Sequence, residues 1–167
     1  QWMIQDRVVD GRTIAFDSPE MRKRITMLYG QMIDVLSANG ALVVLTTVIP
    51  NVGSVRGFNS NDLDEAQRRE VELNKIIAEL VEERPDEAEL IDLAGWLCTG
   101  TKCKEELNGV RLRPDGGHFT AQSSPLAGAF LTPELERIAD ERGLEGDTRP
   151  DGAGDPPALV AGAITGG

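Results

Sequence analysis

The sequence predicts an α/β fold with a parallel sheet, and two adjacent segments carry this prediction. A helical pattern begins at Ser18 and ends at Gly40, and a continuous apolar run over residues 41–48 follows at once. A run of this kind is typical of a strand covered on both faces of a parallel sheet. The succession of helix, glycine and buried strand indicates the α/β class. With 167 residues, of which 40% are hydrophobic, the chain suits one domain with a single core.

The first helix is predicted from its start signal and its period. Ser18, Pro19 and Glu20 supply an N-cap, a first-turn proline and a first-turn acid. Apolar residues then recur at helical spacing until Gly40 ends the helix: Met21, Ile25, Leu28, Met32, Val35 and Leu36.

After the buried strand, residues 50–60 are rich in Gly, Asn and Ser and predict a loop. Such loops lie at the carboxyl ends of strands, where α/β folds bind ligands, so this one is a candidate pocket wall. A second helix is predicted from about residue 60 to before Pro85, with the charged run 62–70 facing water. Its predicted inner side comprises Leu63, Ala66, Leu73, Ile76, Ile77, Leu80 and Val81.

The later elements are predicted less regularly. Residues 89–93 form a short second strand, 96–108 are irregular, and 110–112 are extended. A last helical region covers 122–131, restarts at Thr132-Pro133-Glu134 and closes at Gly143. From residue 144 onward Gly, Pro, Asp and Ala dominate. We therefore predict an α/β domain over 1–143 and a disordered tail over 144–167.

Net charge and hydropathy exclude two classes of partner. The formal charge of −11 and the pI of about 4.5 oppose binding to nucleic acid, and no basic cluster offsets them. The longest apolar stretch, residues 41–50, is far shorter than the roughly 20 residues of a membrane-spanning helix. We predict neither nucleic-acid binding nor a membrane span in this sequence.

The strongest chemical signal is His118, the only histidine, which follows Asp115 by three residues in a Gly-rich turn. A histidine is the usual general base for a hydroxyl nucleophile, and a carboxylate in the same turn can fix its tautomer and stabilise the imidazolium. A solvated loop histidine is the alternative interpretation.

A family resemblance favours the catalytic interpretation. The segment R-P-D-G-G-H-F-T over 113–120, preceded by I-D-L at 91–93 and W-L-C at 96–98, resembles the last conserved block of SGNH hydrolases. The likeness covers roughly residues 1–142 and is closest to the SGNH domain at the C-terminus of bacterial membrane-bound O-acyltransferases. It implies a three-layer α/β/α, flavodoxin-like fold with a parallel sheet. It also implies that a serine attacks an acyl carbonyl, His118 takes its proton and Asp115 orients His118.

The sequence departs from the family pattern at the nucleophile. No Gly-Asp-Ser segment occurs, and the Gly and Asn blocks of the oxyanion hole have no convincing match. We expect these features, with the first strand or strands of the sheet, to precede Gln1. Five serines suit other roles, as a helix cap, loop residues or the start of the last helix: Ser18, Ser54, Ser60, Ser123 and Ser124. Only Asp115 and His118 are carried over, so whether this chain alone is an enzyme stays open.

The resemblance implies an ester hydrolase or O-acyltransferase acting on acyl esters of cell-envelope glycans. The expected location is extracytoplasmic, beside a membrane acyltransferase domain of the same parent protein. A non-catalytic α/β module that binds a glycan or a partner is the alternative, and a small-ligand-binding flavodoxin-like domain is a third. We predict no cofactor, since neither strand is followed by a phosphate-binding Gly-rich turn.

Five further residues have open roles. Cys98 and Cys103 are close enough in sequence to form a small disulfide, which an extracytoplasmic location would favour. Two free thiols are the alternative, and one histidine with two cysteines gives too few ligands for a typical zinc site, so we predict no metal. Trp96, like Trp2, suits either the core or a pocket wall. Arg113 suits either an ion pair or an anionic substrate group.

Overall fold

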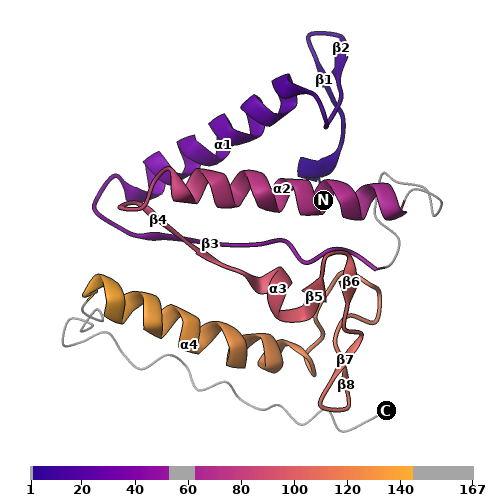
Figure 1. Ribbon diagram of the computed structural model, residues 1–167, viewed down its shortest axis with the longest axis vertical. Coiled ribbons are helices and arrows are strands. Elements are labelled where there is room, and N and C mark those ends of the chain that lie inside the picture. Colours follow the sequence, from indigo (N-terminus) through magenta and orange to yellow (C-terminus); the bar gives the residue numbers. More distant parts are fainter. Residues whose placement is uncertain (1, 53–62, 145–167) are drawn as a thin grey trace, which may run out of the picture.

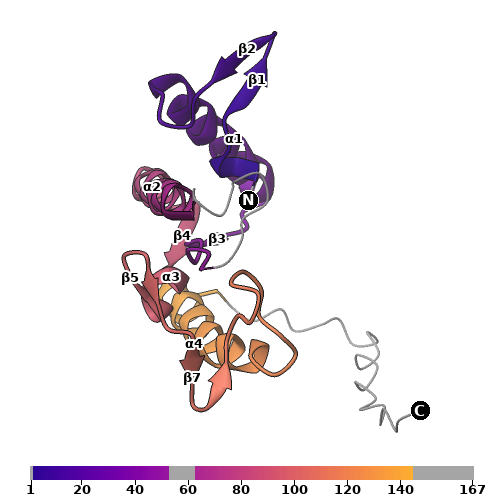
Figure 2. The same ribbon diagram turned by 90° about the vertical axis from the view of Figure 1, so that its right-hand side faces the viewer.

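The computed structural model describes residues 2–52 and 63–144 and confirms the α/β prediction (Figure 1). Strands β3 (Val43–Thr46) and β4 (Ala88–Ile91) pair in parallel, with Val43 opposite Ala88 and Thr46 opposite Ile91. Helices α1 (Pro19–Ser37) and α2 (Leu63–Glu82) lie on one side of this pair, and α4 (Ser124–Arg142) lies on the other (Figures 1 and 2). The predicted three-layer arrangement with a parallel sheet is therefore present.

Helix α1 begins as its sequence predicts. The Ser18 hydroxyl accepts a hydrogen bond from the Met21 N–H at 3.2 Å, and Pro19 occupies the first turn, where its missing N–H costs nothing. Met21, Ile25 and Ile33 are buried, and the first two pack into one core cluster with residues of α2. The strand predicted over 41–48 is shorter than expected, because only four of its residues pair with β4.

Helix α2 corrects the prediction that the charged run 62–70 faces water. Within this run Glu70 is 1% exposed and Gln67 is 9% exposed. The helical repeat explains the burial, since Ala66, Glu70, Leu73 and Ile77 follow one another at intervals of three and four residues. Residues 53–62, which include much of the predicted loop and the predicted start of this helix, lie outside the described ranges.

The N-terminal segment folds as an antiparallel hairpin that we did not predict. After a short 3-10 turn at Trp2–Ile4, strands β1 (Arg7–Val9) and β2 (Arg12–Ile14) are joined through Asp10 and Gly11. Both turn residues have positive φ, 51° and 75°. An Asp-Gly pair between two strands is a known hairpin signal.

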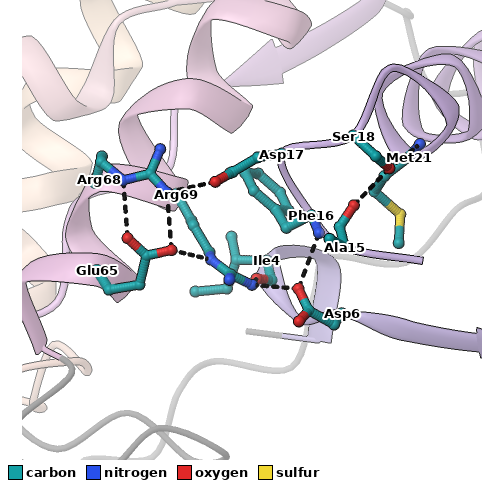
Figure 3. A network of polar contacts seen from close by, with 10 residues as sticks. All are labelled: Ile4, Asp6, Ala15, Phe16, Asp17, Ser18, Met21, Glu65, Arg68 and Arg69. Atoms are coloured by element: carbon teal, nitrogen blue, oxygen red, sulfur yellow. Dashed lines mark hydrogen bonds and ion pairs between the residues drawn. The ribbon is translucent and has the colours of Figure 1, made fainter. Parts of the chain in front are cut away.

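A polar network attaches this N-terminal segment to α2 (Figure 3). The Arg69 guanidinium donates to Asp6 Oδ1 at 2.7 Å and to the Ile4 carbonyl at 3.1 Å, and it lies 5.4 Å from the Phe16 ring centre. The same Asp6 oxygen accepts the Phe16 N–H at 2.9 Å. On the helix itself, Arg69 Nε donates to Glu65 at 2.6 Å. One arginine thus joins the hairpin to the helix.

The segment predicted to be irregular, 96–108, is in fact ordered into short elements. Helix α3 (Leu93–Leu97) is capped by the Asp92 carboxylate, which accepts the Gly95 N–H at 2.9 Å. Two small antiparallel hairpins follow, β5 (Cys98–Thr99) with β6 (Lys102–Cys103) and β7 (Glu106–Leu107) with β8 (Val110–Arg111). Strands of two residues carry too little alternation to be recognised in a sequence.

Helix α4 is continuous, so the predicted restart at 132–134 is wrong. Pro133 lies inside the helix, where a proline removes one backbone hydrogen bond. Ala127 before it and Ile138 after it are both buried, and this packing stabilises the two halves of one helix. Gly143 ends it with φ 61°, as predicted. The tail predicted from 144 onward lies, from residue 145, outside the described ranges.

Candidate functional site

Asp115 and His118 are in direct contact in the turn that connects β8 to α4. Asp115 Oδ2 lies 2.7 Å from His118 Nδ1. Asp115 Oδ1 accepts two backbone N–H groups, from Gly117 at 2.9 Å and from His118 at 2.8 Å. One carboxylate oxygen therefore shapes the turn while the other orients the imidazole. The structure brings together the two residues that the sequence singled out.

The electrostatics of the pair keep the carboxylate charged. The pKa of Asp115 is well below its ordinary value of 3.8, first because of the His118 N–H, then because of the His118 side chain and the Gly117 N–H. Hydrogen bonds to a carboxylate stabilise its ionised form. A charged Asp115 holds a proton on Nδ1 and leaves Nε2 to exchange protons with a substrate or nucleophile. The Asp115 side chain is 59% exposed and the His118 side chain is 81% exposed, so both are accessible.

A second loop, at the carboxyl end of β3, lies against the Asp115/His118 turn. The Val52 N–H donates to the Gly116 carbonyl at 3.0 Å. Asn51 Oδ1 approaches Gly117 so closely that a Cβ added there would lie 2.8 Å from it. This contact confirms that part of the predicted loop 50–60 lies beside the site. Neither Asn51 nor Glu70, whose carboxylate accepts hydrogen bonds from Asn51, was recognisable as a site residue from the sequence pattern.

His118 borders a hollow of about 310 Å³ at the carboxyl ends of the parallel strands. Its other lining residues come from β3, the loop after it, the start of α3 and the turn: Thr46, Thr47, Val48, Ile49, Asn51, Leu93 and Gly117. The Thr47 hydroxyl donates to Asp92 at 2.9 Å and accepts the Ala94 N–H at 2.7 Å, so it is already engaged. The strand ends of an α/β sheet are where ligands usually bind.

Arg113 is buried beside this loop, with 6% of its surface exposed. Its Nη1 donates to the Pro50 carbonyl at 2.9 Å, while Nε and Nη2 have no hydrogen-bond partner among the described residues. Burial lowers its pKa, whereas the charges of Glu70 and Asp115 act in the opposite direction. Arg113 forms no ion pair within the described ranges; its contact is with the loop backbone, which is neither of the two roles considered from the sequence.

The two cysteines form the predicted disulfide, between residues that face each other in the β5–β6 hairpin. Trp96 is partly buried and stacks with Phe130 at 4.9 Å between ring centres and with Phe119 at 6.5 Å. Since Phe119 follows His118 directly, this aromatic stack supports one side of the turn. Trp96 therefore packs against neighbouring aromatic rings, in line with the core interpretation.

Two serines of the described ranges, Ser18 and Ser123, have side-chain hydrogen-bond partners. Ser18 caps α1, and Ser123 is fully buried, donating to the Leu112 carbonyl at 2.6 Å. Ser54 and Ser60 fall outside the described ranges.

Comparison with known families identifies the class of this chain. The model of the SGNH domain that is fused to AT3 domains matches residues 4–133, and the chain belongs to this family. The Asp115/His118 turn and the parallel strands both lie within the match. Comparisons with curated proteins and with solved structures found no match. None of the helices in the described ranges is long and apolar enough to cross a membrane.

Proposed function

We propose that this SGNH domain supplies the acid–base half of a serine-dependent site for acyl esters, with His118 as the general base and Asp115 as its orienting carboxylate. The observation that carries the proposal is the 2.7 Å contact between Asp115 Oδ2 and His118 Nδ1 at the edge of the strand-end hollow. This contact leaves Nε2 as the nitrogen available for proton transfer.

The reaction would proceed through an acyl-enzyme. His118 Nε2 takes the proton of a serine hydroxyl as its oxygen bonds to the acyl carbonyl carbon, and the resulting tetrahedral intermediate collapses as the alcohol leaves with that proton. Water or a sugar hydroxyl then attacks the acyl-serine by the same route, giving hydrolysis or transfer. The exposure of His118 suits a large acceptor such as a glycan.

The nucleophilic serine is expected from chain outside these 167 residues, because the sequence contains no Gly-Asp-Ser segment. The hollow beside His118 suits the binding of a small acyl group, because Val48, Ile49 and Leu93 make part of its wall apolar. The family's fusion to AT3 domains supports a membrane acyltransferase as the neighbouring domain, and we propose an extracytoplasmic location with cell-envelope glycan esters as substrates.

Hydrolysis of an activated acetyl ester tests this proposal. We would measure it for this chain and for a longer form of the parent protein that includes the upstream segment, each with and without His118→Ala. Activity that is confined to the longer form and is lost with His118→Ala supports the proposal. Full activity of His118→Ala would contradict it, and no activity in any form would favour a non-catalytic module that binds a glycan or a partner.

A further inference from the structure

A buried polar cluster connects α2 to the Asp115/His118 turn. Its members are Glu70 and Gln67 on the helix and Asn51 in the loop after β3. All three are at least nine-tenths buried. A buried carboxylate is unfavourable unless hydrogen bonds compensate for the lost hydration, so its partners indicate what it stabilises.

Both carboxylate oxygens of Glu70 accept hydrogen bonds from Asn51. Glu70 Oε2 accepts the Asn51 backbone N–H at 2.8 Å, and Oε1 accepts a side-chain Nδ2–H at 2.6 Å. The Gln67 side chain donates to the Asn51 carbonyl. Because Nδ2 is held by the carboxylate, the amide must point its other atom, Oδ1, away from Glu70. The orientation of the Asn51 amide is thus set by α2.

The fixed oxygen meets the Asp115/His118 turn at Gly117. A Cβ at this position would lie 2.8 Å from Asn51 Oδ1, a distance that real Cβ atoms essentially never show. Gly117 does not have a positive φ, so the backbone conformation does not require a glycine here. The glycine is required because a side chain would collide with Asn51. The Gly117 N–H is also one of the two that bind Asp115 Oδ1. Moving Gly117 would therefore move the Asp115 carboxylate relative to His118.

We infer that Glu70 and Asn51 are positioning residues, which act through Gly117 to set the geometry of the Asp115/His118 pair. This inference rests on the proposed function for its catalytic consequence, whereas its structural consequence is measurable without any activity. Asn51 and Glu70 are separated by 18 intervening residues, and Asn51 and Gly117 by 65, so the cluster exists only in the folded chain.

The test uses the backbone amide proton signals of Gly117 and His118 in NMR spectra at neutral pH. An amide that donates to a carboxylate has a distinct downfield shift, and loss of that bond moves the signal upfield. We expect this movement in Glu70→Gln, because the new NH2 group opposes a donor of Asn51, and in Asn51→Ala. Glu79→Gln is the matched control on the same helix, since Glu79 is 57% exposed and pairs with Arg22.

A double-substitution cycle tests the contact itself. Gly117→Ala should displace both signals in the natural background, and should add much less displacement on top of Asn51→Ala, where Oδ1 is absent. Gly128→Ala is the control, because a Cβ there meets nothing within 4 Å. Circular dichroism would confirm that each variant is folded. If Glu70→Gln does not fold, the cycle of Gly117→Ala and Asn51→Ala decides between the outcomes, because neither substitution removes the buried carboxylate of Glu70.

Unchanged Gly117 and His118 signals in folded Glu70→Gln and Asn51→Ala would overturn the inference, as would an equal effect of Gly117→Ala in both backgrounds. In a longer form that is active, we expect Glu70→Gln and Asn51→Ala to lower kcat about 100-fold with little change in KM. A loss of this size is the effect of misplacing a catalytic group by about 1 Å. Signals that move although no form of the protein hydrolyses esters would refute the proposed function while leaving the positioning role intact.

Discussion

Gly116 and Gly117 are adjacent in the Asp115/His118 turn but are required for different physical reasons. Gly116 has φ 81°, a left-handed conformation that costs other residues about 1–2 kcal/mol. Gly117 is limited by the neighbouring Asn51 side chain. The sequence showed two glycines beside a histidine and gave no means of separating these reasons, because one depends on the backbone and the other on a distant loop.

Gly116→Ala is therefore expected to lower the free energy of unfolding by about 1–2 kcal/mol, the strain of placing a Cβ at positive φ. Urea unfolding followed by circular dichroism measures the change. Gly128→Ala, inside a helix and free of contacts, should instead be neutral or stabilising. Equal effects of the two substitutions would contradict this account of Gly116.

Asp115 is expected to stay ionised wherever the protein is active. Its depressed pKa means that it contributes stability above its ordinary value of 3.8, and that this contribution is lost only as the pH falls through the lower value of the folded state. Protonation of Asp115 should then make no contribution to the acid limb of the activity profile. A ¹³C titration of the Asp115 carboxyl, run beside kcat/KM, checks this. An Asp115 midpoint near 3.8 or above would refute it.

At the scale of elements, α2 connects two parts of the molecule. One side of the helix binds the N-terminal segment through Arg69, and Glu70 and Gln67 bind the loop that lies beside the site. Adjacent residues of a helix point in different directions, which is why one turn of α2 serves both contacts. The period of the apolar residues predicted the helix, but it did not predict that a glutamate belongs to its buried side.

Arg69→Met should destabilise the chain by about 1–3 kcal/mol, because it removes hydrogen bonds from a side chain that is 14% exposed. The hydrogen bonds of Arg68 and then of Arg69 lower the pKa of Glu65 to about 2 from its ordinary value of 4.5. The stability that ionised Glu65 contributes is fully present above pH 4.5 and is lost as the pH falls toward 2. The variant should lose stability less steeply over this range. Thermal unfolding between pH 2 and 7 measures both effects, and an unchanged pH dependence would contradict them.

The β5–β6 hairpin depends on its covalent link. Cys98 and Cys103 close a loop with a sequence separation of five. Loop-closure entropy for so short a loop predicts a loss of about 2 kcal/mol when both cysteines are replaced by serine. Chemical denaturation of the double variant measures the loss. A free energy of unfolding equal to that of the natural chain would contradict this account of the hairpin.

At the scale of the whole molecule, the pattern of the sequence predicted the main elements, whereas the three layers were implied by the family resemblance. The long periodic segments gave α1, α2 and the buried strand, and their order gave the parallel pair. Asp115 and His118 were also predictable, because both belong to one short turn. The residues that hold this turn in place were not predictable, since Asn51 and Glu70 join the site only through tertiary packing.

Our central proposal is that His118 activates a serine hydroxyl. Reaction of the longer parent protein with a fluorophosphonate, followed by mass spectrometry, tests it most directly, because such probes label serines that a neighbouring base has activated. We expect one adduct on a serine outside this chain, lost in His118→Ala and retained in the control Glu79→Gln. An adduct of the same extent in His118→Ala would contradict it.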